Sequence, residues 1–127
     1  MLNSTGIKKT THAAPTQILF NVQLQQSVGV IVSATGITAG SDGKKIVKAG
    51  TPLAGDLTAR GTAFAKSSST VEAVGVLLHD VDVTAGNNNG TLLIFGFVNL
   101  NRLDTATVAL ITSDVKEELN AKVTFLK

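Results

Sequence analysis

Two apolar runs with a polar connection between them dominate the hydrophobic pattern of the chain. Residues 73–83 (AVGVLLHDVDV) start almost entirely apolar and then alternate with two aspartates, and residues 91–100 (TLLIFGFVNL) form the most hydrophobic segment. Residues 84–90 (TAGNNNG) lie between them, and Gly and Asn tolerate positive φ at low cost. The pattern predicts two strands joined as a hairpin, which we expect to form the centre of a single β-rich domain.

A second alternating segment precedes this hairpin, at residues 16–32 (TQILFNVQLQQSVGVIV). A period near two is typical of a half-buried strand. Here the alternation sets Ile18, Phe20, Val22 and Leu24 against Leu19, Asn21, Gln23 and Gln25, and Val28, Val30 and Val32 continue it after a short break. We therefore expect a strand along this segment.

Weaker signals predict the remaining elements. Before the hairpin they indicate a loop at 33–43, a short strand at 44–48, a turn at 49–56 leading to a short extended piece, and an exposed linker at 65–70. After it, Asp104 is placed to cap a short helix near Thr105. Residues 114–117 have the spacing of a capping box and predict a helix over 114–120, with Val115 and Leu119 on one face. Residues 122–127 (KVTFLK) alternate like a final strand.

The N-terminal residues 1–15 (MLNSTGIKKTTHAAP) differ from the rest because they are polar and offer little apolar surface to bury. They predict either an extended arm or a plain disordered tail. With 127 residues, the chain is long enough for one domain of common size. We expect an arm at 1–15 and a single domain at 16–127. The predicted fold class is mainly β, in a small single-domain fold with one or two short helices near the C-terminus.

Composition narrows the classes of partner and compartment. The net charge is only +2, Lys and Arg are scattered, and Trp and Tyr are absent, which argues against direct binding of nucleic acid. Cysteine is absent, which removes disulfides and thiolate zinc sites and fits a reducing interior. No segment has the roughly 20 apolar residues of a membrane span, and no secretion signal is recognisable.

Three groups of residues are candidate sites for chemistry. His79 stands beside Asp80, but neighbouring residues of a strand point to opposite faces. Asp80, Asp82 and the asparagines at 87–89 suggest a calcium loop, yet Ala85 and Thr91 stand where its glycine and glutamate are needed. The third group, residues 40–44, suggests a phosphate loop. Such a loop needs a glycine where Thr38 stands and a serine or threonine where Lys45 stands, so the pattern does not match.

Lys66 was considered as the modified lysine of a lipoyl- or biotinyl-type carrier barrel, which would require it at a tight hairpin tip. It lies instead in a serine-rich stretch with no flanking methionine. None of these groups forms a working active site. We therefore expect a protein that is not an enzyme and has no cofactor, metal or small-molecule substrate.

The order of segments from Gly50 onward resembles the lambda gpD-like head decoration proteins of bacteriophages. The segments that carry the resemblance are Thr51-Pro52-Leu53, Ala73-Val74-Gly75-Val76-Leu77, the 84–90 turn, the 91–98 strand, the 114–120 helix and the final strand at 123–126. They span roughly the C-terminal 75 to 80 residues. Each motif is short, and their order and spacing make the resemblance.

The resemblance implies a β-tulip-like or barrel-like fold, a homotrimer, and binding to the major capsid protein on the outside of the expanded head at (quasi-)three-fold sites. It places the protein in the virion, with the host cytoplasm as the site of assembly, and implies no contact with membranes. It also implies that an N-terminal arm orders on the capsid. The residues expected to bind there are Leu2, Asn3, Ser4, Thr5, Gly6, Ile7, Lys8, Lys9, Thr10 and Thr11.

The segment 16–43 departs from the family because it is longer and more strand-like than the family's N-terminal part. This departure leaves open a more elaborate arm or a different oligomer. The alternative function is another virion interaction module built on the same small β domain, such as the base of a head fibre or a tail component.

Overall fold

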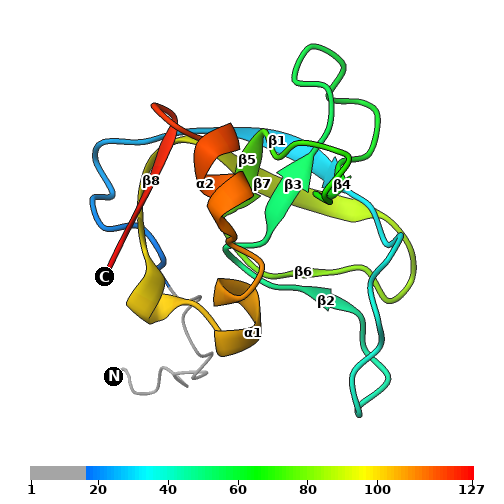
Figure 1. The fold of residues 1–127 in the computed structure, drawn as a ribbon. Coiled ribbons are helices and arrows are strands. Elements are labelled where there is room, and N and C mark those ends of the chain that lie inside the picture. Colours follow the sequence, from blue (N-terminus) through cyan, green and yellow to red (C-terminus); the bar gives the residue numbers. More distant parts are fainter. Residues whose placement is uncertain (1–16) are drawn as a thin grey trace, which may run out of the picture.

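Strand β7 (Asn88–Asn99) is the longest element, and the main sheet is built around it (Figure 1). The computed structural model describes residues 17–127. The other strands are β1 (Gln26–Val32), β2 (Ile46–Val47), β3 (Pro52–Ala54), β4 (Ala65–Lys66), β5 (Gly75–Leu77), β6 (Val81–Asp82) and β8 (Val123–Leu126). The helical elements are the 3-10 turn η1 (Leu100–Arg102) and the short helices α1 (Thr105–Val108) and α2 (Ser113–Glu118).

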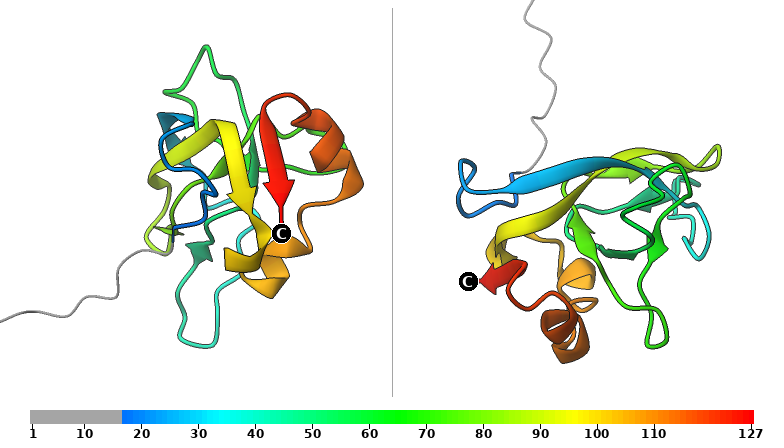
Figure 2. Two further views of the ribbon diagram at one scale, coloured as in Figure 1. Left: turned by 90° about the vertical axis from the view of Figure 1, so that its left-hand side faces the viewer. Right: turned by 90° about the horizontal axis from the view of Figure 1, so that it is seen from above.

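The main sheet has the order β1-β7-β5-β3-β4, with antiparallel neighbours, and β8 joins β7 in parallel. Strands β2 and β6 form a separate antiparallel pair. Both views of Figure 2 place α1, α2 and β8 together on one side of the domain, away from β1. The expected fold class is confirmed: the protein is a small, mainly β single domain with two short helices near the C-terminus.

The sheet curls until its two outer strands meet at Phe64, which precedes β4. The Phe64 amide donates to the Ile31 carbonyl at 2.7 Å, and the Ser33 amide donates to the Phe64 carbonyl at 2.8 Å. A parallel bridge between Val32 and Phe64 marks the meeting point. The Phe64 side chain is fully buried, so this contact joins the ends of the curled sheet through both backbone and core.

The core has two parts because β7 buries side chains on both faces. Successive residues of a strand point to opposite sides, so Leu92 and Leu93 enter different clusters. Leu92 packs inside the curled sheet with Phe64, whereas Leu93 packs toward the helices. Val115 and Leu119 from the α2 region join the second cluster, which confirms the apolar face expected for this helix.

The expected hairpin is confirmed only in part. Strand β5 does pair antiparallel with β7, but the chain bends after Leu77, and β6 pairs with β2 instead. At the other end, Asn88, Asn89 and Gly90 belong to β7 and not to the turn, because they pair with the last three residues of β1. The run 73–83 is therefore two short strands, since its second half finds its partner outside the main sheet.

The helices lie where they were expected, but their caps differ. Asp104 precedes α1 without making a side-chain capping bond. The cap of α2 is Thr112, whose hydroxyl accepts a hydrogen bond from the Val115 amide at 3.3 Å. The capping box proposed at Asp114 is thus wrong, and Asp114 lies in the first turn of the helix. The linker expected at 65–70 is also wrong at its start, because its first two residues form β4.

Candidate interaction surface

Of the two candidate catalytic residues, His79 and Asp80, the aspartate has a structural role. His79 and Asp80 are exposed and lie in the bend between β5 and β6, not in the continuous strand that was expected. One Asp80 carboxylate oxygen accepts the Ala49 amide at 2.7 Å, and the other lies 3.8 Å from the Lys48 ammonium. Asp80 therefore holds this bend against the segment that follows β2.

The candidate calcium ligands bind backbone groups instead. Asp82 accepts the Thr84 amide at 2.9 Å, and Asn87 accepts the Ala34 amide at 3.0 Å. Hydrogen bonds from Thr84 hold the pKa of the Asp82 carboxyl below its usual value of 3.8, and the charge of Lys44 acts in the same direction. Within residues 17–127, no group of three or more His, Asp or Glu side chains is placed to hold a metal ion.

The glycine-rich segment 40–44 forms a tight turn. The Gly40 amide donates to the Lys44 carbonyl and the Gly43 amide to the Gly40 carbonyl, each at 2.9 Å. The Asp42 carboxylate accepts the Lys44 amide, which places a negative charge in the turn, and the chain continues into β2 without a helix. Lys66 pairs with Leu53 inside the sheet, so it does not sit at the hairpin tip that a carrier lysine would need.

The expected capsid-binding residues, Leu2 to Thr11, lie outside the described residues. The first described residue, Gln17, is tied to the domain by a hydrogen bond of 3.3 Å from the Arg102 guanidinium to its carbonyl. Ile18 and Leu19, which follow it, are buried. Residues 17–19 are therefore held against the domain.

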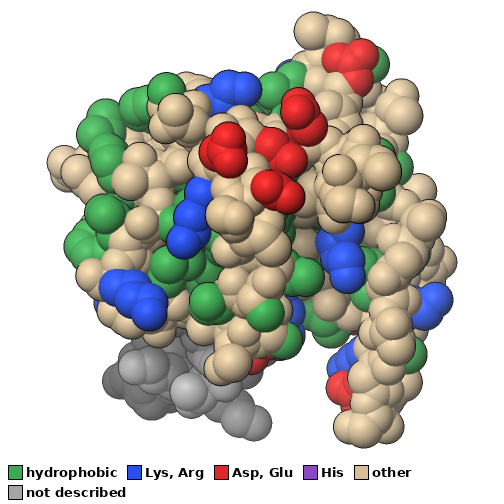
Figure 3. Space-filling model, viewed as in Figure 1, with side chains coloured by type: hydrophobic (Ala, Val, Ile, Leu, Met, Phe, Trp, Pro, Cys, Tyr) green, Lys and Arg blue, Asp and Glu red, His purple; other side chains and the backbone are tan. Residues whose placement is uncertain are grey.

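The surface feature that sequence reasoning missed is an exposed apolar loop, residues 20–24. Phe20, Val22 and Leu24 are 50%, 54% and 47% exposed. Their alternation predicted the buried face of a strand, and that prediction is wrong for these three residues. The other large exposed hydrophobic side chains are Leu57, Val71, Phe95, Leu110 and Leu126. In Figure 3, hydrophobic side chains gather along the left-hand edge, where Figure 1 places residues 17–25 and β8.

The apolar loop is an excursion from an otherwise continuous strand pairing. Leu19 bridges Val98 on β7, and Gln26 pairs with Phe95. Between these two pairs the chain spends six residues, 20–25, opposite only two residues of β7, so four residues are in excess. Chain segments that interrupt a ladder in this way bend the strand and redirect its side chains.

Gly96 allows the close approach of the loop to β7. It has a φ of 152°, and a Cβ at this position would lie 3.3 Å from the Gln25 Cβ and 3.5 Å from the Leu24 carbonyl oxygen. The Gln25 side-chain oxygen is enclosed and has no hydrogen-bond partner among the described residues. The base of the apolar loop is therefore tightly packed, while its tip is exposed.

Two of the hollows on the described surface lie away from the apolar loop. One of about 270 Å³ beside α1 is lined by Lys48, Lys66 and Asp104 together with apolar and hydroxyl side chains. The other, of about 450 Å³, is lined by the carboxylates of Glu72, Asp114, Glu117 and Glu118, and Figure 3 shows acidic side chains together over the α2 region. The two lysines of the first hollow are exposed and Asp104 opposes their charge, and most of the carboxylates of the second are exposed as well, so neither hollow forms an enclosed polar site.

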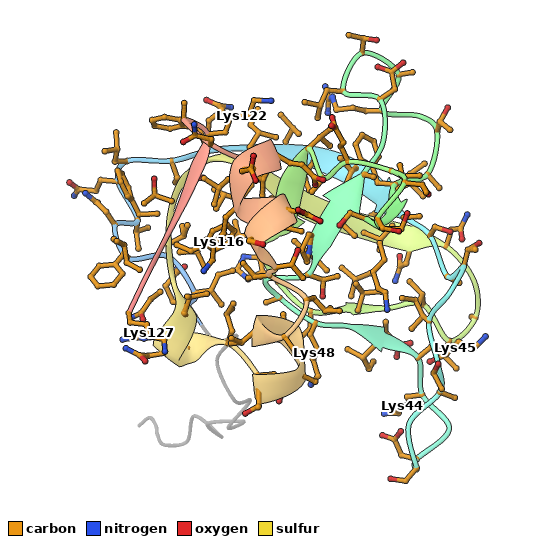
Figure 4. The ribbon with its side chains drawn as sticks, in the orientation of Figure 1. Lys44, Lys45, Lys48, Lys116, Lys122 and Lys127 are labelled. Atoms are coloured by element: carbon orange, nitrogen blue, oxygen red, sulfur yellow. The ribbon has the colours of Figure 1, made fainter. Side chains whose placement is uncertain are left out.

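Basic side chains are spread over several elements. Figure 4 labels six lysines, which come from the 40–45 turn, the end of β2, α2, the loop before β8 and the C-terminus. They do not converge on one point in this view.

Comparison of the sequence with models of protein families finds no match, and comparison with curated proteins finds none either. Among the described residues, no helix has the length and apolar character required to cross a bilayer.

Proposed function

We propose that the chain is a bacteriophage capsid decoration protein. It binds the outside of the expanded head at (quasi-)three-fold sites, as a homotrimer, and cements neighbouring major capsid proteins against the pressure of packaged DNA. Residues 1–15 act as the arm that orders on the capsid.

The observation that carries this proposal is the placement of the segments that resemble the decoration proteins. Five of them fall on β3, β5, β7, α2 and β8, in the same chain order. Two of these strands, β5 and β8, each pair directly with a third, β7. The resemblance therefore follows one connected part of the fold and is not spread over unrelated loops.

A cement protein acts through its surfaces. It needs a rigid scaffold and exposed groups that a neighbouring protein can cover, and exposed apolar side chains that lie together are typical of such interfaces. The curled sheet with its two buried clusters supplies the scaffold, and the exposed side chains along the edge formed by residues 17–25 and β8 supply apolar surface. A segment that orders on binding gives specificity at an entropic cost, which repetition around a shell offsets through avidity.

The test uses expanded, empty heads of the phage whose genome encodes the chain. The full-length protein is expected to sediment with expanded heads, and electron microscopy of the particles should show added density at the three-fold sites. Deleting residues 1–15 should leave a folded protein, with an unchanged thermal midpoint, that no longer coats the heads. A full-length protein that leaves expanded heads bare contradicts the proposed function, whereas a truncated protein that coats them as well as the full chain contradicts only the role of the arm.

A further inference from the structure

We propose that the apolar loop, residues 20–24, is a second contact with the capsid, which seats Phe20, Val22 and Leu24 in an apolar recess beside the site that receives residues 2–11. This inference rests on the proposed function and adds to it a contact made by the folded domain itself. The loop, not the arm alone, would then set how the domain sits on the shell.

The first support is the charge distribution along the chain. No Asp, Glu, Lys or Arg occurs between residues 10 and 41, although the chain as a whole carries 20 such residues. This uncharged stretch contains the apolar loop and all of β1, whose outer edge is already occupied at Gly29 and Ile31 by hydrogen bonds from Arg60 and Phe64. The large exposed apolar side chains among the described residues of the stretch are therefore those of the loop, and the centres of protein interfaces are depleted in charge and enriched in aromatic residues. The composition of this stretch is therefore typical of a protein–protein interface.

The second support is the way in which the loop is held. Its N-terminal end is fixed by the Phe20 amide, which donates to the Phe97 carbonyl at 2.8 Å, and by the Asn99 amide, which donates to the Ile18 carbonyl at 2.8 Å. Its C-terminal end enters β1 at Gln26. Four excess residues between these fixed ends push the side chains of the loop outward, although a direct connection along β7 would not need them. The loop is thus presented on a rigid base, which lowers the entropic cost of binding.

The short chain between the expected arm contacts and the loop indicates that the capsid protein is the partner that covers the loop. Phe20 follows Thr11, the last expected arm contact, by only nine positions, and an extended chain of that length reaches about 30 Å at most. Gln17, which is fixed to the domain by Arg102, lies three residues before the loop begins. A capsid protein that binds residues 2–11 is therefore brought next to the loop. A neighbouring copy in the proposed homotrimer is the alternative partner for the loop, and the solution mass of the loop variant distinguishes the two.

The test compares two full-length variants in the same head-binding titration. The loop variant carries Phe20→Ser, Val22→Ser and Leu24→Ser. The control variant carries Leu57→Ser and Val71→Ser, which remove exposed apolar side chains far from the loop in sequence. The loop variant is expected to bind expanded heads at least ten-fold more weakly than the unmodified protein, with an unchanged solution mass and thermal midpoint. The control is expected to bind within two-fold of the unmodified protein.

The remaining outcomes would contradict the inference, and they can be distinguished from one another. Equal binding by the loop variant contradicts the loop contact while leaving the proposed function intact. A lower solution mass of the free loop variant assigns the loop to contacts between copies of this chain instead. If the unmodified protein does not bind heads, the proposed function and the inference fail together. Should the triple variant not fold, the single variant Val22→Lys, at a position that is 54% exposed, decides the question by placing a charge in the contact.

Discussion

Replacing Gly75 by alanine is expected to destabilise the domain strongly, because this glycine lets β5 lie close against β7. A Cβ at Gly75 would stand 2.5 Å from the Leu93 carbonyl oxygen and 2.9 Å from the Leu92 Cγ. The carbonyl is part of the central strand and cannot rotate away, so the two strands must separate where Val76 pairs with Leu93. Overpacking in a filled core typically costs 1–3 kcal/mol, and a clash with backbone belongs at the upper end, about 3 kcal/mol.

The expected change in thermal midpoint follows from chain length. An unfolding entropy of about 2.1 cal/mol/K per residue gives about 0.27 kcal/mol/K for 127 residues. A loss of about 3 kcal/mol therefore lowers Tm by about 11 °C, measured by circular dichroism or calorimetry of the purified protein.

The matched control is Gly61→Ala. A Cβ at Gly61 would meet no atom within 4 Å, and its φ is not in the positive range, so alanine there should stabilise slightly by restricting the unfolded chain. A Gly75→Ala protein that melts within about 3 °C of the unmodified one would show that β5 and β7 separate at little cost, and the clash argument would be wrong.

Two further predictions concern polar groups. Gln25→Leu removes an enclosed oxygen that has no partner and should raise the free energy of unfolding by about 1 kcal/mol in urea titrations, whereas Gln23→Leu, at an exposed position, should leave it nearly unchanged. Asp82→Ala tests the hydrogen bonds from Thr84, which lower the pKa of the Asp82 carboxyl. The stability that this carboxylate adds should be fully present above its unfolded pKa, near 3.8, and disappear as the pH falls through the lower folded pKa. Unmodified and Asp82→Ala proteins should therefore differ at pH 6 and converge at the lowest pH; a difference that grows with acid would contradict this.

Much of the fold could be predicted from local patterns. β7 was expected because residues 92–98 are almost entirely apolar, and such a run favours a strand buried on both faces. The final strand and the α2 region were expected from alternation and from the spacing of Val115 and Leu119. In each of these elements, the pattern that predicts the element lies within about ten residues of the chain.

Partners and exact bounds could not be predicted in the same way, because they depend on contacts between distant segments. Asn88 to Gly90 have turn composition, yet they extend β7 because β1, more than 55 residues earlier, offers them a ladder. Likewise β6 leaves the main sheet for β2. Turn propensity is worth less than the backbone hydrogen bonds gained by pairing, so tertiary context prevails at these positions.

The apolar loop shows why alternation alone was misleading. A period of two predicts a buried face only if the strand runs in register with a partner. Here Leu19 and Gln26 pair with residues of β7 that are only three positions apart, so the six residues between them cannot all pair with β7. The excess residues leave the ladder, and the alternating side chains that would have faced the core face solvent instead. The feature of the sequence that could have indicated this surface is the absence of charge across residues 10–41. Neither a half-buried strand nor a solvated loop requires such an absence. Violations of local sequence rules tend to concentrate where a protein meets its ligands or partners, so the misjudged residues Phe20, Val22 and Leu24 are the ones to substitute first.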